Sequence, residues 1–172
     1  MKCRVMVLSL VVSIYAVAAF ADDDIYVRTG IGTGTNYGTG YGINNEFVAN
    51  DYISGQLGVG YLPGVGWGAV GGLSLYPVKN NQYYVSPRVS ALYGRMSSVN
   101  LSNYNGSGQT KKSEMKGFAL GGGAEYPLVS ANKNVRLGVD IYYVILQTPS
   151  GYTRSDKEID IRASVGIAYA FK

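Results

Sequence analysis

Residues 158–171, EIDIRASVGIAYAF, alternate between apolar side chains, most of them large, and small or charged ones. Val165 and Ile167 fall on one face of an extended strand, whereas Asp160 and Arg162 fall on the other. This period of two predicts a strand that separates two environments. In a soluble barrel the large apolar side chains point inward, but in a membrane barrel they face lipid and the small and charged ones fill the lumen.

The same alternation recurs along the chain in segments of about 9–14 residues, and a tilted strand needs about 9–11 residues to cross a bilayer. The predicted strands cover residues 25–34, 40–48, 53–62, 66–76, 83–94, 116–128, 134–147 and 158–171. Short polar turns at 50–51, 79–81 and 130–134 alternate with connections at 34–39, 63–65, 95–115 and 148–157. We therefore expect an all-β, eight-stranded antiparallel up-and-down transmembrane barrel, with its two long loops at one end.

On the apolar face, aliphatic residues occupy the strand centres and aromatic residues gather near the strand ends. Towards the loop end lie Tyr41, Tyr61, Trp67, Tyr93, Phe118 and Tyr143. Towards the turn end lie Phe47, Tyr83, Tyr126, Tyr169 and Phe171. Two aromatic girdles around an aliphatic band are what a bilayer selects, because amphipathic rings prefer its two interfaces.

The opposite face mixes glycine and serine with charged residues, as the narrow interior of an eight-stranded barrel requires. Four arginines meet four carboxylates there, so we expect a neutral charge network in the lumen. Its predicted members are Arg28, Glu46, Arg88, Glu125, Arg136, Asp140, Asp160 and Arg162.

The first 21 residues have a different pattern. Lys2 and Arg4 precede an apolar run from Val5 to Phe20, which ends in Ala19-Phe20-Ala21. This pattern predicts a secretory signal peptide over residues 1–21 and an outer-membrane barrel domain over residues 22–172. The only cysteine, Cys3, lies in the segment to be removed, so the mature chain is expected to have no disulfide.

Composition narrows the classes of function. Without Lys2 and Arg4 the 15 basic residues become 13 against 11 acidic ones, a charge too small to indicate nucleic-acid binding. The absence of histidine excludes a Ser-His dyad, and with no mature cysteine it leaves no credible zinc site. The glycine-rich stretch GIGTGTNYGTGYG (30–42) precedes no predicted helix and is interpreted as strand, loop and strand. We expect no catalytic, cofactor-binding or metal-binding residues, and no enzyme activity.

The two long loops carry the remaining candidates for contact with a ligand. These are Tyr104, Lys111 and Lys112 in the first loop, and Tyr152 and Arg154 in the second. Basic residues here could bind lipopolysaccharide phosphates or host polyanions. The alternative is that both loops are solvated and serve only solubility.

The segments ISGQLGVGYLPG (53–64), GFALGGGAEYPL (117–128) and ASVGIAYAF (163–171) resemble the small eight-stranded barrels of the OmpA/OmpX type, which include opacity-type surface proteins. The resemblance covers residues 25–171. It implies a Gram-negative outer membrane, with periplasmic chaperones and the barrel-assembly machinery as partners during biogenesis. Members of the family usually end in an aromatic residue that this machinery recognises. Phe171 matches that pattern, although Lys172 follows it.

The expected function is that of a monomeric outer-membrane barrel with a filled polar lumen and no cofactor. Its role would be structural, or adhesin-like through loops 95–116 and 148–157. Expected partners are outer-membrane lipid, lipopolysaccharide and a possible host or surface ligand. Two alternatives stay open: a soluble periplasmic lipocalin-like barrel that binds a small apolar ligand, and a narrow porin.

Overall fold

The computed structural model describes residues 25–38, 40–63, 66–78, 85–103, 110–129, 132–147, 152–154 and 159–171. The predicted signal peptide, residues 1–21, lies outside the described residues, as do Tyr83 and Tyr104. No helix among the described residues is both long and apolar enough to span a membrane.

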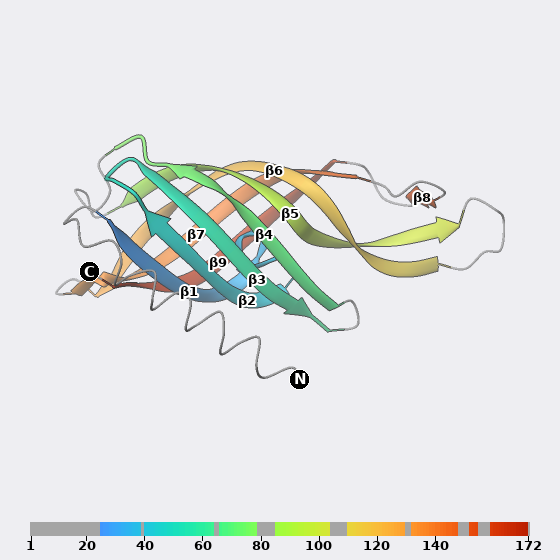
Figure 1. Cartoon of the computed structure of the whole chain (residues 1–172), viewed down its shortest axis with the longest axis horizontal. Coiled ribbons are helices and arrows are strands. Elements are labelled where there is room, and N and C mark those ends of the chain that lie inside the picture. The colour runs from blue at the N-terminus through green and yellow to red at the C-terminus, as the bar shows by residue number, and fades with distance from the viewer. Residues whose placement is uncertain are drawn as a thin grey trace.

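The described residues are almost entirely strand, with one short 3₁₀ turn (Figure 1). The elements are β1 (Tyr26–Gly34), η1 (Thr35–Tyr37), β2 (Gly40–Val48), β3 (Ile53–Leu62), β4 (Gly66–Leu75), β5 (Ser86–Asn103), β6 (Thr110–Val129), β7 (Asn132–Leu146), β8 (Tyr152–Arg154) and β9 (Ile159–Phe171).

Eight of these strands close into an antiparallel barrel. From β1 to β7 each strand pairs with the next, β7 pairs with β9, and β9 returns to β1. The last pairing sets Val27 opposite Phe171, so the two ends of the barrel sheet meet and no long strand edge stays open between them. The predicted eight-stranded up-and-down barrel is therefore confirmed, and most strand bounds agree with the prediction within about two residues.

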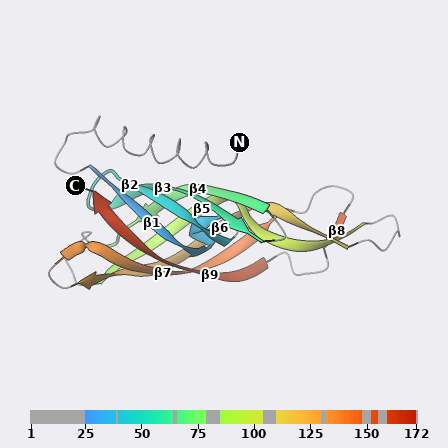
Figure 2. The same cartoon turned by 90° about the horizontal axis from the view of Figure 1, so that it is seen from below.

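The clearest error concerns residues 95–115, which were predicted to be a loop. β5 and β6 instead continue beyond the barrel as a paired hairpin, with register from Ser97–Met115 to Ser102–Thr110. β8 pairs with the outer part of β5 through Leu101–Arg154 and Asn103–Tyr152. We call this three-stranded structure the extension; it projects from the loop end of the barrel (Figures 1 and 2). The two strands stay paired although their sequence shows no apolar alternation here, because the hydrogen bonds between strands join backbone groups and do not depend on side chains.

The two barrel faces carry the residues that the alternation assigned to them. Large apolar residues point outward: Leu57, Leu73, Leu120, Ile141 and Ile161 are between 51% and 74% exposed. Arg28, Glu46, Glu125 and Asp140 point inward and are at most 4% exposed. Two outward aromatic residues, Tyr61 and Trp67, are cross-strand partners, and the centres of their rings lie 5.3 Å apart.

The interior is not polar throughout, which corrects the expectation of a uniformly polar lumen. Its turn-end half holds six of the eight predicted charged residues, but an apolar cluster fills the loop-end half beside β4 to β7. That cluster consists of Val70, Leu92, Met115, Ala119, Tyr142, Val144 and Leu146. The inward positions of β7 change from Arg136 and Asp140 to Val144 and Leu146 along one strand, so the alternation predicts the face but not the chemistry at each depth.

Candidate functional site: the charged lumen and the extension

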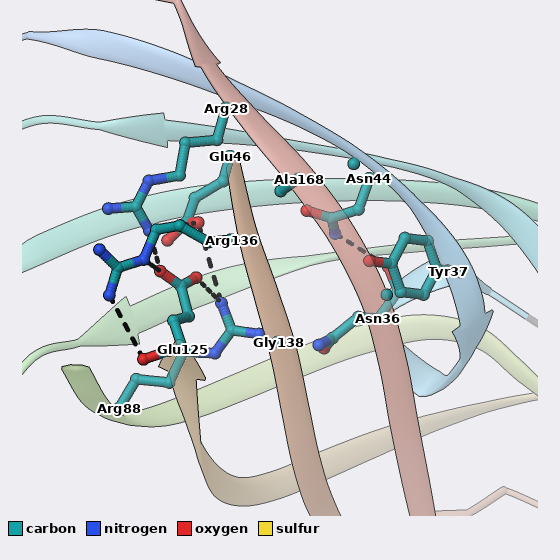
Figure 3. Close-up of a pocket in the computed structure, with 12 residues that line it drawn as sticks. Arg28, Asn36, Tyr37, Asn44, Glu46, Arg88, Glu125, Arg136, Gly138 and Ala168 are labelled. Atoms are coloured by element: carbon teal, nitrogen blue, oxygen red, sulfur yellow. Dashed lines mark hydrogen bonds and ion pairs between the residues drawn. The ribbon is translucent and has the colours of Figure 1, made fainter. Parts of the chain in front are cut away.

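Glu125 on β6 is the centre of the charged cluster (Figure 3). Its carboxylate pairs with Arg28 of β1, with Arg88 Nη1 of β5 at 2.7 Å, and with Arg136 Nε of β7 at 3.2 Å. Three guanidinium groups from three strands thus meet one carboxylate, and all four side chains are buried. Such convergence is tolerated in a low-dielectric interior because the charges are compensated within hydrogen-bonding distance.

Asp140 on β7 binds Arg88 through two hydrogen bonds. Arg88 Nε donates to Asp140 Oδ1 at 2.7 Å, and Arg88 Nη2 donates to Oδ2 at 2.5 Å. This paired geometry orients the planar guanidinium and leaves Nη1 directed at Glu125.

Glu46 on β2 completes the cluster from the other side. Ser54 and Tyr76 donate hydrogen bonds to Glu46 Oε1, the latter at 2.5 Å, and Arg28 Nη1 lies 3.4 Å from Oε2. Tyr76 also lies beneath Arg28, whose guanidinium carbon is 5.7 Å from the ring centre. Tyr76 was not among the predicted network residues, although it continues the inward alternation of the strand predicted over residues 66–76.

The structure brings six of the eight predicted network residues together. Asp160 and Arg162 lie apart from them and form their own pair, with Arg162 Nη2 2.7 Å from Asp160 Oδ2. Their side chains are 40% and 28% exposed, so this pair is partly solvated. The six-residue cluster is formally neutral, with Arg28, Arg88 and Arg136 against Glu46, Glu125 and Asp140.

Glycines make room for the long side chains. Gly123 lies across from both Arg88 and Asp140, and Gly138 lies across from Glu125. A side chain at Gly138 would come within 3.3 Å of Arg88 Nη2. The glycine and charge mixture of the inward face therefore has a direct steric cause.

The connection between β1 and β2 folds into the lumen instead of projecting from its mouth. Asn36 Nδ2 donates to Asp140 Oδ2 at 2.7 Å, and its Oδ1 accepts from the Tyr142 hydroxyl at 2.6 Å. Its backbone N–H donates to Ser164 Oγ at 3.1 Å, and its carbonyl accepts from Asn44. η1 thereby links β2, β7 and β9 across the interior, between the charged cluster and the apolar cluster.

A small cavity of about 20 Å³ remains between η1 and the charged cluster. It is lined by polar side chains that include Asn36, Tyr37, Asn44 and Arg88. This volume suffices for about one water molecule and not for an organic ligand. The described part of the lumen is therefore filled by its own side chains.

The predicted loop contacts lie in or beside the extension. Lys111 and Lys112 fall on β6, where their backbone pairs with Leu101 and Asn100. Tyr152 and Arg154 are the two ends of β8, whereas Tyr104 lies outside the described residues. Two segments that seemed independent loops in the sequence thus belong to one sheet.

Comparison with known proteins gives a likeness of fold. The N-terminal β-barrel domain of Pseudomonas aeruginosa OprF, known from its crystal structure, matches with a TM-score of 0.50 and 14% sequence identity. The match covers 87% of this chain and 98% of that domain. In fold, the chain is similar to that eight-stranded barrel domain. No protein-family model and no curated protein matches the sequence. At 14% identity the likeness supports the architecture alone, and the narrower likeness to opacity-type proteins stays a prediction.

Proposed function

We propose that this protein is an integral β-barrel of the Gram-negative outer membrane, with a filled lumen and a structural or surface-interaction role. The observation that carries the proposal is the outward band of large apolar residues around a closed barrel, with Ile31 67% and Ile161 74% exposed. Soluble proteins rarely expose one continuous apolar surface of this extent, whereas lipid contact favours it.

The interior supports this proposal over both alternatives. A lipocalin-like barrel needs an apolar cavity for its ligand, but the cavity described here is small and lined by arginine, glutamate and asparagine. A narrow porin needs a continuous aqueous path, and η1 together with the charged cluster occupies the described lumen. We therefore assign no transport or ligand storage to the barrel.

The extension supports a role at the cell surface. It places the backbone of Lys111, Lys112 and Arg154 in one sheet beyond the barrel. Several cations in one surface element favour contact with a polyanion. Signal-peptide cleavage after residue 21, chaperone delivery, insertion by the barrel-assembly machinery and a monomeric state belong to the same proposal.

The membrane assignment is tested by fractionation of cells that express the full chain. We expect the protein in the outer-membrane fraction, resistant to a carbonate wash and released by detergent. A soluble periplasmic protein expressed in the same cells is the control and should appear in the osmotic-shock fluid. Recovery of the chain in that fluid would contradict the proposal.

The surface role is tested by replacing residues 98–113 with an Asn-Gly turn, which removes the extension and keeps the barrel strands. Cells with the full chain should bind heparin-coated beads, and cells with the shortened chain should bind fewer. The shortened barrel should still fold, because the extension lies outside the closed sheet. Equal bead binding by both cell lines would exclude the extension as the polyanion contact.

A further inference from the structure

Arginine and lysine side chains are distributed unevenly between the two faces of the barrel. The structure describes six such side chains, and four of them, Arg28, Arg88, Arg136 and Arg162, belong to the inward face. The other two, Arg95 on β5 and Lys116 on β6, are exposed on the outward face. They are not scattered: Arg95 and Lys116 are direct cross-strand partners.

The position of this pair along the barrel matters. Tyr93 and Phe118, which are also direct partners, lie two residues nearer the barrel middle on the same outward face. They are 52% and 44% exposed and belong to the loop-end aromatic girdle. A bilayer places such rings at its interface, so side chains one outward position beyond them reach the depth of the lipid headgroups. A register irregularity directly follows Arg95, between Arg95 and Ser97, and such bulges re-aim neighbouring side chains.

Two cations that face each other across strands repel one another, and an anion bound between them relieves that repulsion. Arg95 has a further interaction within the chain. Its guanidinium group carries five N–H donors, more than a single bidentate contact uses. A phosphate monoester suits the pair, because arginine binds phosphate oxygens in a planar fork and lysine adds a point charge.

We propose that Arg95 and Lys116 form a binding site for the phosphate groups of an anionic lipid headgroup in the outer leaflet. The inference rests on the proposed membrane function, because that function sets the depth of the pair. It adds a ligand class and two residues to that function: a phosphorylated glycolipid is bound at the barrel wall, below the extension. Neither residue belongs to the lumen cluster, so their substitution leaves the interior charges untouched.

The test measures retention of radiolabelled diphosphoryl lipid A by the immobilised, detergent-folded full chain. The dephosphorylated lipid is measured in parallel, and inorganic phosphate is added as a competitor. We expect saturable retention of the diphosphoryl lipid, weak retention of the dephosphorylated one and little competition by inorganic phosphate. Competition by inorganic phosphate at the concentration of the lipid would reassign the site to a free anion and overturn the lipid assignment.

The variants are Arg95→Gln, Lys116→Gln and both together, with Lys133→Gln near the start of β7 as the matched control. Each single substitution should weaken retention about fivefold and the double about thirtyfold, whereas the control should match the parent. Parent-like retention by the double variant, or equal loss in the control, would overturn the proposal. Each protein is also tested for folding by its mobility on a cold SDS gel. A parent chain that never folds into detergent or vesicles would instead contradict the membrane function itself.

Discussion

At the scale of single residues, Val139 and Asp140 show how one strand serves two environments. They are neighbours on β7, yet Val139 is 47% exposed on the outer wall and Asp140 is 1% exposed inside. The burial of Asp140 is possible because Arg88 gives it two hydrogen bonds and Asn36 a third. Successive strand residues point to opposite faces, so adjacent substitutions should have unrelated consequences.

The Arg88–Asp140 pair should show strong coupling in a double-mutant cycle. Arg88→Met leaves Asp140 with its hydrogen bond from Asn36 and should cost about 3–5 kcal/mol, because an uncompensated charge stays buried. Asp140→Ala should cost less, about 1–3 kcal/mol, because Arg88 keeps Glu125 at 2.7 Å. The double variant should cost less than the sum of the singles. Urea unfolding in lipid vesicles measures all three, and additive effects would show that the pair is not coupled.

Val139→Arg tests the outward face. An arginine here would place an unpaired cation against hydrocarbon and should destabilise the barrel by about 2–4 kcal/mol if it lies near the midplane. Val139→Leu, which stays apolar, is the control and should be close to neutral. The measurement is again urea unfolding in vesicles. A harmless Val139→Arg would reverse the assignment of faces and favour the soluble barrel.

At the scale of elements, η1 is the feature that distinguishes this interior from a simple strand cylinder. The main chain can enter because β3 has glycines opposite it: a side chain at Gly58 would overlap the carbonyl oxygen of Asn36. Gly38, at φ +82°, then turns the chain back towards β2 in a conformation that side-chain-bearing residues rarely adopt. η1 is therefore held in place by its hydrogen bonds, and it fits into the space that the missing side chain of Gly58 leaves.

The burial of η1 can be tested with a cysteine, because the only native one, Cys3, lies in the predicted signal peptide. Thr35 is 1% exposed, and its hydroxyl has no hydrogen-bond partner among the described residues, so Thr35→Cys should be tolerated. Its thiol should resist maleimide in the folded barrel and react once Gly58→Ala displaces η1. Pro63→Cys, at an exposed turn, is the reactive control. Equal reactivity of Thr35→Cys and Pro63→Cys in the parent barrel would contradict the buried position.

At the scale of the whole molecule, the barrel sheet closes on itself. Each of the eight barrel strands pairs with a neighbour on both sides, and the β1–β9 pairing joins strands that are far apart in sequence. A barrel without open edges has to break many ladder hydrogen bonds together in order to unfold. The extension lies outside this closed circuit.

Closure predicts heat-modifiable mobility. Unheated protein in SDS should stay compact and migrate faster than boiled protein, because detergent alone does not open a closed barrel. The barrel with residues 98–113 replaced should behave in the same way, since its eight-strand circuit is intact. The measurement is a cold SDS gel of heated and unheated samples. Identical mobility before and after boiling would count against the closed barrel.

Most members of the charged cluster could be predicted from the sequence, but the partners with which each of them forms hydrogen bonds and ion pairs could not. The alternation assigns Arg28, Glu125 and Asp140 to the inner face, and the need for compensation predicts that they pair. Which groups meet depends on the register around the circle. Asn36 and Asp140, which are hydrogen-bonded, are 104 residues apart in the chain. Tyr142 and Tyr76 continue the inward alternation of their predicted strands and could have been found, whereas no strand pattern includes Asn36.

The sequence alone determined the number of barrel strands, the bounds of most of them and the face of nearly every barrel residue, because a period of two is a local property of an extended chain. Only the tertiary structure decided the insertion of η1, the apolar half of the lumen and the extension with β8. Each of these depends on contacts between segments distant in the chain. Space beside Gly58 admits η1 from another hairpin, and the edge of β5 accepts Tyr152–Arg154 from a connection about fifty residues later. Such contacts produce no periodic pattern of apolar and polar residues in the segments that make them.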